Sequence, residues 1–355
     1  MKRFKYLAVI ACVFLLFLTA CSGEKKTNTK VKLGEVTRSL FYAPQYVALE
    51  KGFFADEGLD VELQTTWGGD KAMTALLSDG IDIALVGSET SIYVYGQGSK
   101  DYAVNFAQLT QTDGTFLVAK DEHPQFKWEE LRNSKFLGQR KGGMPQMVGE
   151  YVLKQHDIDP HADLQLSQNI EFANIPGAFG TGDYQYVQLF EPTASIFEKE
   201  GKGHVVASFG EESGTVPYTV FMAKQSFMKE NEETVKKFTR AIYTAQQWVA
   251  EHSAEETAEI IQKYFDDTDL DILTSSIERY KNQGSYATDP ILKKDSWENL
   301  QNIMDEAGEL PGDAPYEDLV NTDIAKKIMK ENRRWQSLSF LSLENVTHHY
   351  FTKKM

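Results

Sequence analysis

Short apolar runs and helical stripes of apolar residues alternate through the first part of the chain. Val31–Val36 and Leu59–Leu63 have the pattern of strands, and Pro44 suits the first turn of a helix between them. A second apolar stripe at helical spacing follows Asp70, which we expect to cap that helix, and Ile81–Val86 has the pattern of a buried strand. This order of elements predicts a parallel sheet with right-handed crossovers.

A second set of strands and helices follows a polar stretch at Lys120–Pro124. We expect this stretch to carry the chain into a second lobe, and Pro217–Met222 to bring it back. The further strands that the pattern predicts are 102–109, 114–119, 135–137, 170–175, 186–190 and 204–209. From Ser226 onward the apolar periodicity is helical, with helices expected at 232–252, 254–265, 269–282, 294–307 and 316–335.

These patterns predict an α/β protein whose two lobes close like a hinged clamp. Lobe 1 would comprise residues 31–119 and 215–335, and lobe 2 residues 120–214. The hinges would lie at the two crossings, near Ala119–Glu122 and Ser213–Pro217. Small ligands bind at the carboxyl edge of open α/β sheets, so the turns after the strands are the candidate site.

The first twenty residues have the layout of a secretory signal rather than of a folded element. Basic residues precede an apolar run, Tyr6–Leu18, that is too short for a comfortable membrane span. Cys21 follows small residues, as in the lipobox of bacterial lipoproteins, so we expect Cys21 to carry a lipid. Residues 21–30 would then tether the protein to the outer face of the cell membrane. The alternative is an ordinary signal peptide with a chance cysteine.

Charge and cysteine content exclude several classes of function. Removing residues 1–20 takes away three basic and no acidic residues, so the net charge changes from −15 to −18. Such a surface argues against nucleic acid or an anionic membrane as a partner. Cys12 and Cys21 are the only cysteines, so the domain after them has no thiol for a disulfide, thiolate catalysis or a metal site.

Neither a metal site nor a catalytic motif is expected. His156 and His161 lie among aspartates, but their spacing matches no established pair of metal ligands, and a solvated acidic loop explains them better. No nucleophile elbow, metalloprotease helix motif or Walker loop occurs in the sequence. We therefore expect no cofactor and no catalytic residue.

Several motifs in chain order together resemble one family of transport proteins. These motifs are Tyr42-Ala-Pro, Glu50–Phe54, Gly58–Glu62, Leu77–Gly80 with Asp82-Ile-Ala, and Phe190-Glu-Pro. They resemble periplasmic-binding-type substrate-binding lipoproteins of ABC importers, in the group that binds thiamine-precursor pyrimidines, alkanesulfonates and nitrate. The resemblance spans about residues 31–334. It implies a type II two-lobe clamp, a monomer, and a permease and an ATPase as partners.

The resemblance also implies which residues contact the ligand between the lobes. The implied contacts in lobe 1 are Tyr42, Trp67, Gly68, Gly87 and Ser88, those in lobe 2 are Gly142, Gly143, Met144 and Glu191, and Tyr218 lies near the return crossing. The Gly-Gly-Met turn departs from the family's frequent Ser- or Thr-containing loop, which weakens the case for an oxyanion site there.

Acidic and aromatic residues near these turns favour a nitrogenous ring over an anion. The acidic residues are Asp70, Glu89, Asp113 and Glu191, and we expect Glu89 and Glu191 to touch the ligand. A carboxylate repels sulfonate and accepts hydrogen bonds from N–H groups. The flat side chains are Phe41, Tyr42, Trp67, Phe190 and Tyr218. We favour a thiamine-precursor aminopyrimidine, with sulfonate as the alternative. A purely structural explanation of the same residues is that the acidic ones cap helices and the aromatic ones pack in the core.

Two other classes of function stay open, and the C-terminal tail is unusual. The family has pyrimidine-synthesising enzymes as relatives, but these carry a cysteine-rich motif that residues 22–355 cannot supply. A sensor lipoprotein could present the same clamp to a signalling partner. In the tail, residues 336–355, the stretch Ser339–Phe351 alternates like a strand and resembles the first strand of an ABC ATPase, which suggests a reading-frame junction. An ordinary extra strand or a disordered tail is the alternative.

Overall fold

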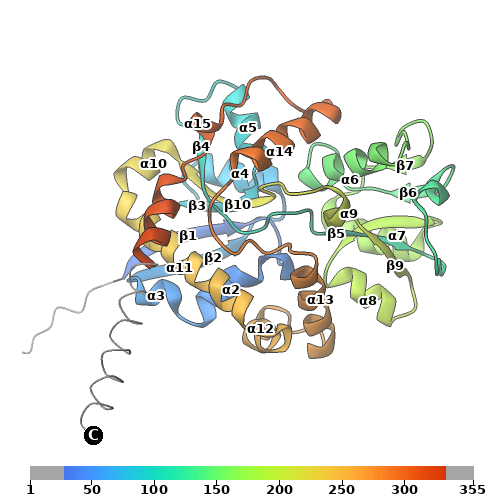
Figure 1. Ribbon diagram of the computed structural model, residues 1–355, viewed down its shortest axis with the longest axis horizontal. Helices are drawn as coiled ribbons and strands as arrows, with labels where there is room; N and C mark the ends of the chain where they lie inside the picture. Colours follow the sequence, from blue (N-terminus) through green and yellow to red (C-terminus); the bar gives the residue numbers. More distant parts are fainter. Residues whose placement is uncertain (1–27, 333–355) are drawn as a thin grey trace, which may run out of the picture.

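The computed structural model describes residues 28–332, which form two α/β lobes side by side (Figure 1). The expected lipid attachment at Cys21 and the tail at 336–355 lie outside these residues. Each lobe is built around its own five-stranded sheet. Within the described residues no helix is both long enough and apolar enough to cross a membrane.

The sheet of lobe 1 has the strand order β2-β1-β3-β10-β4. Its strands are β1 (Thr29–Glu35), β2 (Leu59–Thr65), β3 (Ile83–Gly87), β4 (Ala103–Gln108) and β10 (Thr219–Lys224). β1 pairs in parallel with β2 and β3, as the sequence pattern predicts, whereas β10 runs antiparallel to both of its neighbours. β3, β4 and most of β10 are buried, which explains their continuous apolar character.

The sheet of lobe 2 has the order β7-β6-β8-β5-β9. Its strands are β5 (Thr115–Ala119), β6 (Lys135–Leu137), β7 (Gln165–Ser167), β8 (Tyr186–Phe190) and β9 (His204–Ser208). β5 is antiparallel to both β8 and β9 and takes the same place in this sheet that β10 takes in the first. The two sheets therefore have the same arrangement, and the chain enters and leaves lobe 2 through neighbouring segments.

Helices cover both sheets, and most of the C-terminal ones pack on lobe 1. In the first pass through lobe 1 they are η1 (Leu40–Tyr42), α2 (Ala43–Glu50), α3 (Phe53–Asp56), α4 (Gly69–Leu77) and α5 (Glu89–Gly96). Lobe 2 contributes η2 (Trp128–Leu131), α6 (Met144–Gln155), η3 (Phe172–Asn174), α7 (Ile175–Thr181), α8 (Thr193–Lys199) and α9 (Phe209–Glu212). The C-terminal region adds α10 (Gln225–Glu230), α11 (Glu232–Glu251), α12 (Ala254–Ile261), η4 (Gln262–Tyr264), α13 (Leu270–Asn282), α14 (Lys294–Glu306) and α15 (Tyr316–Leu319), followed by helical residues 323–332.

The first crossing between the lobes lies earlier than the sequence pattern suggests. The strand 114–119 was expected in lobe 1, with the crossing at 119–122, but β5 forms all of its ladder hydrogen bonds with lobe 2 strands. The crossing is therefore residues 109–114. It runs beside the return crossing, where Tyr218 N–H donates to the Thr110 carbonyl at 3.2 Å and Val216 N–H to the Gln111 carbonyl at 3.0 Å. The return crossing lies between the end of α9 at Glu212 and the start of β10 at Thr219.

Three local expectations also differ from the structure. Residues 170–175 are not a strand, because η3 and the start of α7 occupy them. α4 begins at Gly69 rather than after an Asp70 cap, which leaves the Asp70 carboxylate available to lobe 2. The last predicted helix is interrupted at 320–322, because Val320 forms a bridge with Asn105 beside β4.

Two C-terminal helices of lobe 1 contact lobe 2. α13 packs on η1 in lobe 1 and on α8 in lobe 2, whereas α14 packs on α6 in lobe 2 (Figure 1). At the end of α13, the Gln283 side chain donates to the Asp113 carbonyl at 2.8 Å and accepts from the Ser208 hydroxyl at 2.6 Å. The lobes are thus joined by helix contacts as well as by the two crossings.

A substitution at Gly210, near the start of α9, tests how tightly the lobes pack at this junction. A Cβ atom at Gly210 would lie 2.2 Å from the Asp113 carbonyl oxygen and 2.1 Å from Gln283 Nε2. Because a backbone atom cannot yield, Gly210→Ala should lower the free energy of unfolding by about 2–3 kcal/mol in urea denaturation. Gly177→Ala is the matched control: no atom lies within 4 Å of that Cβ, and alanine should stabilise α7 by about 0.5 kcal/mol. Equal effects of the two substitutions would contradict the packing described here.

Candidate functional site

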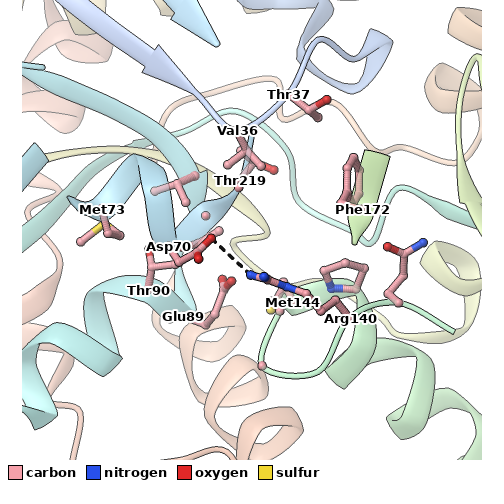
Figure 2. A pocket seen from close by; sticks show the side chains of 18 of the residues that line it. Val36, Thr37, Asp70, Met73, Glu89, Thr90, Arg140, Met144, Phe172 and Thr219 are labelled. Carbon is pink, nitrogen blue, oxygen red and sulfur yellow. Dashed lines mark hydrogen bonds and ion pairs between the residues drawn. The ribbon is translucent and has the colours of Figure 1, made fainter. Parts of the chain in front are cut away.

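A cavity of about 450 Å³ lies between the lobes, at the ends of strands from both sheets. Lobe 1 contributes residues at and after the ends of β1, β2 and β3, and lobe 2 contributes the turn after β6, two residues after β7, and Phe190 at the end of β8. The carboxyl ends of parallel strands are the usual ligand-binding edge of such sheets, and the volume suits one small molecule. Figure 2 shows side chains from both lobes around this space.

Nine of the eleven residues that we expect to contact the ligand line this cavity. The nine that do are Tyr42, Trp67, Gly68, Gly87, Glu89, Gly142, Gly143, Met144 and Tyr218. Ser88 does not, because its hydroxyl turns toward the return crossing and donates to the Pro217 carbonyl. Glu191 does not line the cavity either. The structure therefore places the expected strand-end residues around one cavity, whereas the side chains of Ser88 and Glu191 point away from it.

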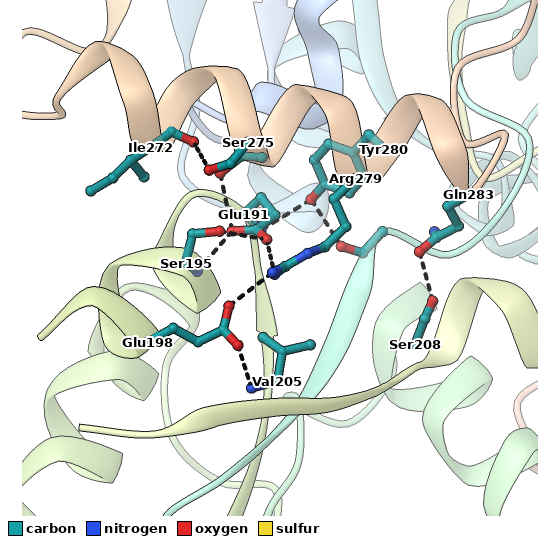
Figure 3. A network of polar contacts seen from close by, with 12 residues as sticks. Glu191, Ser195, Glu198, Val205, Ser208, Ile272, Ser275, Arg279, Tyr280 and Gln283 are labelled. Carbon is teal, nitrogen blue, oxygen red and sulfur yellow. Dashed lines mark hydrogen bonds and ion pairs between the residues drawn. The ribbon is translucent and has the colours of Figure 1, made fainter. Parts of the chain in front are cut away.

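Glu191 is buried outside the cavity lining, in a network of polar contacts (Figure 3). The expectation that it faces the cleft fails because three neighbours take up its carboxylate: Arg279 at 2.5 Å, the Ser195 N–H and hydroxyl at 2.9 and 3.0 Å, and Ser276 at 3.3 Å. Its backbone N–H donates to the Tyr280 hydroxyl at 3.0 Å. Arg279 also pairs with Glu198 at 2.8 Å. The Glu191 side chain is fully buried, and its contacts with Arg279 and Ser276 join lobe 2 to α13.

Glu89 is the buried carboxylate among the residues that line the cavity. It is the first residue of α5, is only 5% exposed, and lies against Gly87, where a Cβ atom would be 2.1 Å from Glu89 Oε2. Burial raises the pKa of this carboxyl to about 7, although hydrogen bonds from its own backbone N–H and that of Met144 oppose the rise. Met144 begins α6 in lobe 2, so Glu89 reaches across the cleft.

Aromatic rings form a second part of the wall. Phe190 and Tyr218 line the cavity, and both pack on the buried ring of Phe41, at centroid distances of 6.0 and 5.5 Å. Phe172 lies 5.8 Å from Phe190 and faces the cavity from lobe 2 (Figure 2). Trp67 stands at the wall with 57% of its surface exposed and a left-handed backbone, φ 60°. These flat surfaces suit a planar ligand.

The two cations that line the cavity face carboxylates. Arg140 follows β6 in lobe 2 and pairs with Asp70 of lobe 1 at 3.2 Å, a contact across the cleft (Figure 2), and with Glu171 at 3.4 Å. Lys141 lies 3.9 Å from Glu309. No other Arg or Lys within residues 28–332 lines the cavity. The wall thus offers an incoming anion little uncompensated positive charge.

Four cavity residues carry signals that the sequence reasoning missed. Gln139 and Arg140 come directly after the predicted strand 135–137, at the strand end where site residues are expected. Tyr93 lies four positions after Glu89, so helical spacing places both on one face of α5. Phe172 was assigned to a strand and so was not considered. Among residues 28–332 no group of three or more His, Cys, Asp or Glu side chains is placed to hold a metal ion.

Comparison with known proteins agrees with this architecture. The NMT1-like family matches residues 24–263 of the chain. The Bacillus subtilis (strain 168) protein named "Putative binding protein YtlA" is 63% identical over 324 residues, which cover 91% of this chain and 97% of that protein.

Two solved structures share the fold at low sequence identity. The ligand-binding component of an ABC-type import system from Staphylococcus aureus, with zinc bound, has a TM-score of 0.69 and 16% identity, and the match covers 85% of this chain and 99% of that chain. The alkanesulfonate-binding protein SsuA from Xanthomonas axonopodis pv. citri, bound to MOPS, has a TM-score of 0.67 and 13% identity, with 83% and 98% covered. At these identities the matches show the common two-lobed fold.

Proposed function

The chain belongs to the NMT1-like family, and from that premise we propose that it is an extracytoplasmic solute-binding protein of an ABC importer. It captures a small nitrogenous aromatic molecule, of the kind represented by thiamine-precursor aminopyrimidines. The high identity to a protein named as a binding protein supports the role, and the fold shared with an import component supports the transport system.

The composition of the cavity wall carries the choice of ligand. The aromatic side chains suit a ring, the buried Glu89 carboxylate suits N–H donors, and Arg140 is engaged by Asp70 and Glu171. Tyr42, Trp67, Gly68 and Gly87 would contact the ligand from lobe 1; Gly142, Gly143, Met144 and Tyr218 would complete the enclosure. Closure of the lobes buries the ligand and presents a surface to the permease.

The remaining parts of the proposal concern location and partners. A lipid on Cys21 would hold the protein as a monomer on the outer face of the cell membrane, beside a permease and an ATPase. A signalling role would use the same clamp with a different partner. The enzyme alternative lacks support in the sequence, because residues 22–355 contain no cysteine for the motif of the pyrimidine-synthesising relatives.

A small anion such as an alkanesulfonate is the second candidate ligand. One observation favours it: the turn Gly142–Met144 at the N-terminus of α6 lines the cavity, and helix N-termini attract anions. However, the Met144 N–H already bonds to Glu89 and the Gly142 N–H donates to Gln146 Oε1 at 2.9 Å. Both amides thus have protein acceptors.

A thermal-shift panel on the purified protein tests the proposed ligand class. Aminopyrimidines, thiamine, alkanesulfonates, nitrate and riboflavin are compared at about one hundred times an expected micromolar Kd. Ligand binding to the folded state alone should raise the Tm by roughly 5–10 °C for an aminopyrimidine. A shift with sulfonate or nitrate and none with aminopyrimidines would overturn the ligand class. Uptake of the labelled ligand by cells should cease when the gene is deleted.

A further inference from the structure

Two buried acceptor atoms without a hydrogen-bond partner belong to residues that line the cavity from opposite lobes. They are Glu89 Oε2 on α5 and Gln139 Oε1 in the turn after β6. Eight buried side-chain atoms lack a partner within residues 28–332, and these two share one cavity. Buried polar groups in proteins are nearly always hydrogen-bonded, and a cluster of exceptions calls for a specific explanation.

The orientation of Gln139 is set by the protein. Its amide nitrogen donates to the Gln188 carbonyl at 2.6 Å, so its oxygen is the atom left over. Gln188 is held in turn, because its own amide nitrogen donates to Thr115 Oγ1 at 2.7 Å and to the Pro145 carbonyl at 2.8 Å. Gln139 therefore presents an acceptor from lobe 2, whereas Glu89 presents one from lobe 1.

The two buried acceptors, one of which is a carboxylate, indicate which chemical group a ligand must bring to bond with them. A buried carboxylate without a counter-charge is costly, so the matching group brings N–H donors and a full or partial positive charge. An oxyanion has the opposite properties: it brings only acceptors and would face Glu89 at short range. The two cations that line the cavity, Arg140 and Lys141, have carboxylate partners already.

We propose that Glu89 selects the charge of the ligand, together with Gln139. The cavity takes a molecule that presents at least two N–H donors on one edge, as an amidine or a protonated aminopyrimidine does, and rejects sulfonate and nitrate. The Glu89 carboxylate lies beside the Met144 N–H at the start of α6, where an anion would otherwise bind, so the protein supplies its own negative charge at that point. This inference rests on the proposed function, because it assigns the recognition step of the same cavity.

Isothermal titration calorimetry on the full-length protein in detergent tests this assignment. The probes are 4-amino-2-methylpyrimidine, its oxo analogue 2-methylpyrimidin-4-one, nitrate and methanesulfonate. Of the four probes, the aminopyrimidine should bind most tightly to the protein without substitutions, and neither anion should bind. Glu89→Gln should weaken aminopyrimidine binding on the order of 30-fold, because a charge-assisted hydrogen bond is lost. Gln139→Leu should weaken it about tenfold.

Glu259→Gln is the matched control, because it removes an exposed carboxylate on α12, outside the cavity lining. It should change the aminopyrimidine affinity by less than about threefold. Equal binding of aminopyrimidine by the unmodified protein and by Glu89→Gln would overturn this inference and leave the proposed function standing. Binding of an anion but of no aminopyrimidine, or of no probe at all, would overturn both. Circular dichroism establishes that each variant is folded.

Discussion

Replacing Arg279 with methionine should lower the free energy of unfolding by about 3 kcal/mol. Arg279 lies on α13 and pairs with Glu191, whose side chain is fully buried, and with Glu198, both in lobe 2. The substitution keeps much of the side-chain volume but leaves the Glu191 carboxylate without its cation. Removing one partner of a buried ion pair costs about 3–5 kcal/mol, and the lower end applies because the Arg279 side chain is 31% exposed. Urea denaturation measures the loss.

Lys199→Met is the control for this prediction. Lys199 also joins α8 to α13, where it pairs with Asp269 at 2.7 Å, but both side chains are largely exposed. Exposed ion pairs contribute about 0.2–1 kcal/mol, so this variant should lose far less stability. Adding Glu191→Gln to Arg279→Met should recover part of the loss, because no unpaired charge is then buried. A loss below about 1 kcal/mol in Arg279→Met would show that Ser195 and Ser276 alone hold Glu191.

Glu191 also shows how far sequence reasoning reaches in this protein. Phe190-Glu191-Pro192 correctly marks the end of a strand, because a strand end is a local feature of the pattern. The direction of the Glu191 side chain depends on Arg279, which lies 88 positions later and approaches only in the folded chain. No local pattern contains that partner. The same holds for Ser88, whose hydroxyl bonds to Pro217 on the return crossing.

The walls of the cavity were predictable because the parallel strands of lobe 1 end at one edge. Trp67 follows β2 and Gly87 ends β3, and strand polarity alone brings them to the same edge. The lobe boundary was not predictable in this way. β5 has the apolar pattern of a buried strand, which fits either sheet, and only its pairing with β8 and β9 assigns it to lobe 2. The hydrophobic pattern of a segment shows whether it is buried and helical or extended, but it does not show which strands pair with it.

Glu89→Gln should make the ligand-free protein more stable, by about 3 kcal/mol at pH 8. Burial raises the pKa of Glu89 from 4.5 to about 7, so between these values the folded protein holds a proton that the unfolded chain has released. Stability therefore falls as the pH rises from about 4.5 to 7 and levels off above, and a shift of this size corresponds to about 3 kcal/mol. Glutamine has no charge to bury at any pH, so the variant escapes this loss.

The groups that face Glu89 do not offset its charge. They are the hydroxyls of Tyr42, Tyr93 and Tyr218, from η1, α5 and the return crossing, and burial raises the pKa of each, so all three stay neutral. Asp113, whose pKa burial raises to about 6, adds a pH dependence of the same sign. Because both proteins contain Asp113, the difference between them isolates Glu89.

Urea denaturation of the two proteins at pH 5, 6, 7 and 8, without ligand, measures this difference. It should grow by about 2–3 kcal/mol across the series, whereas Glu259→Gln should stay within about 0.5 kcal/mol of the unmodified protein throughout. A constant difference would mean that Glu89 is ionised and well solvated in the free protein, and that the cavity opens to water before the ligand arrives. A growing difference means that the buried Glu89 carboxylate lowers the free energy of unfolding of the ligand-free protein. A cationic ligand should then raise this free energy again when it binds.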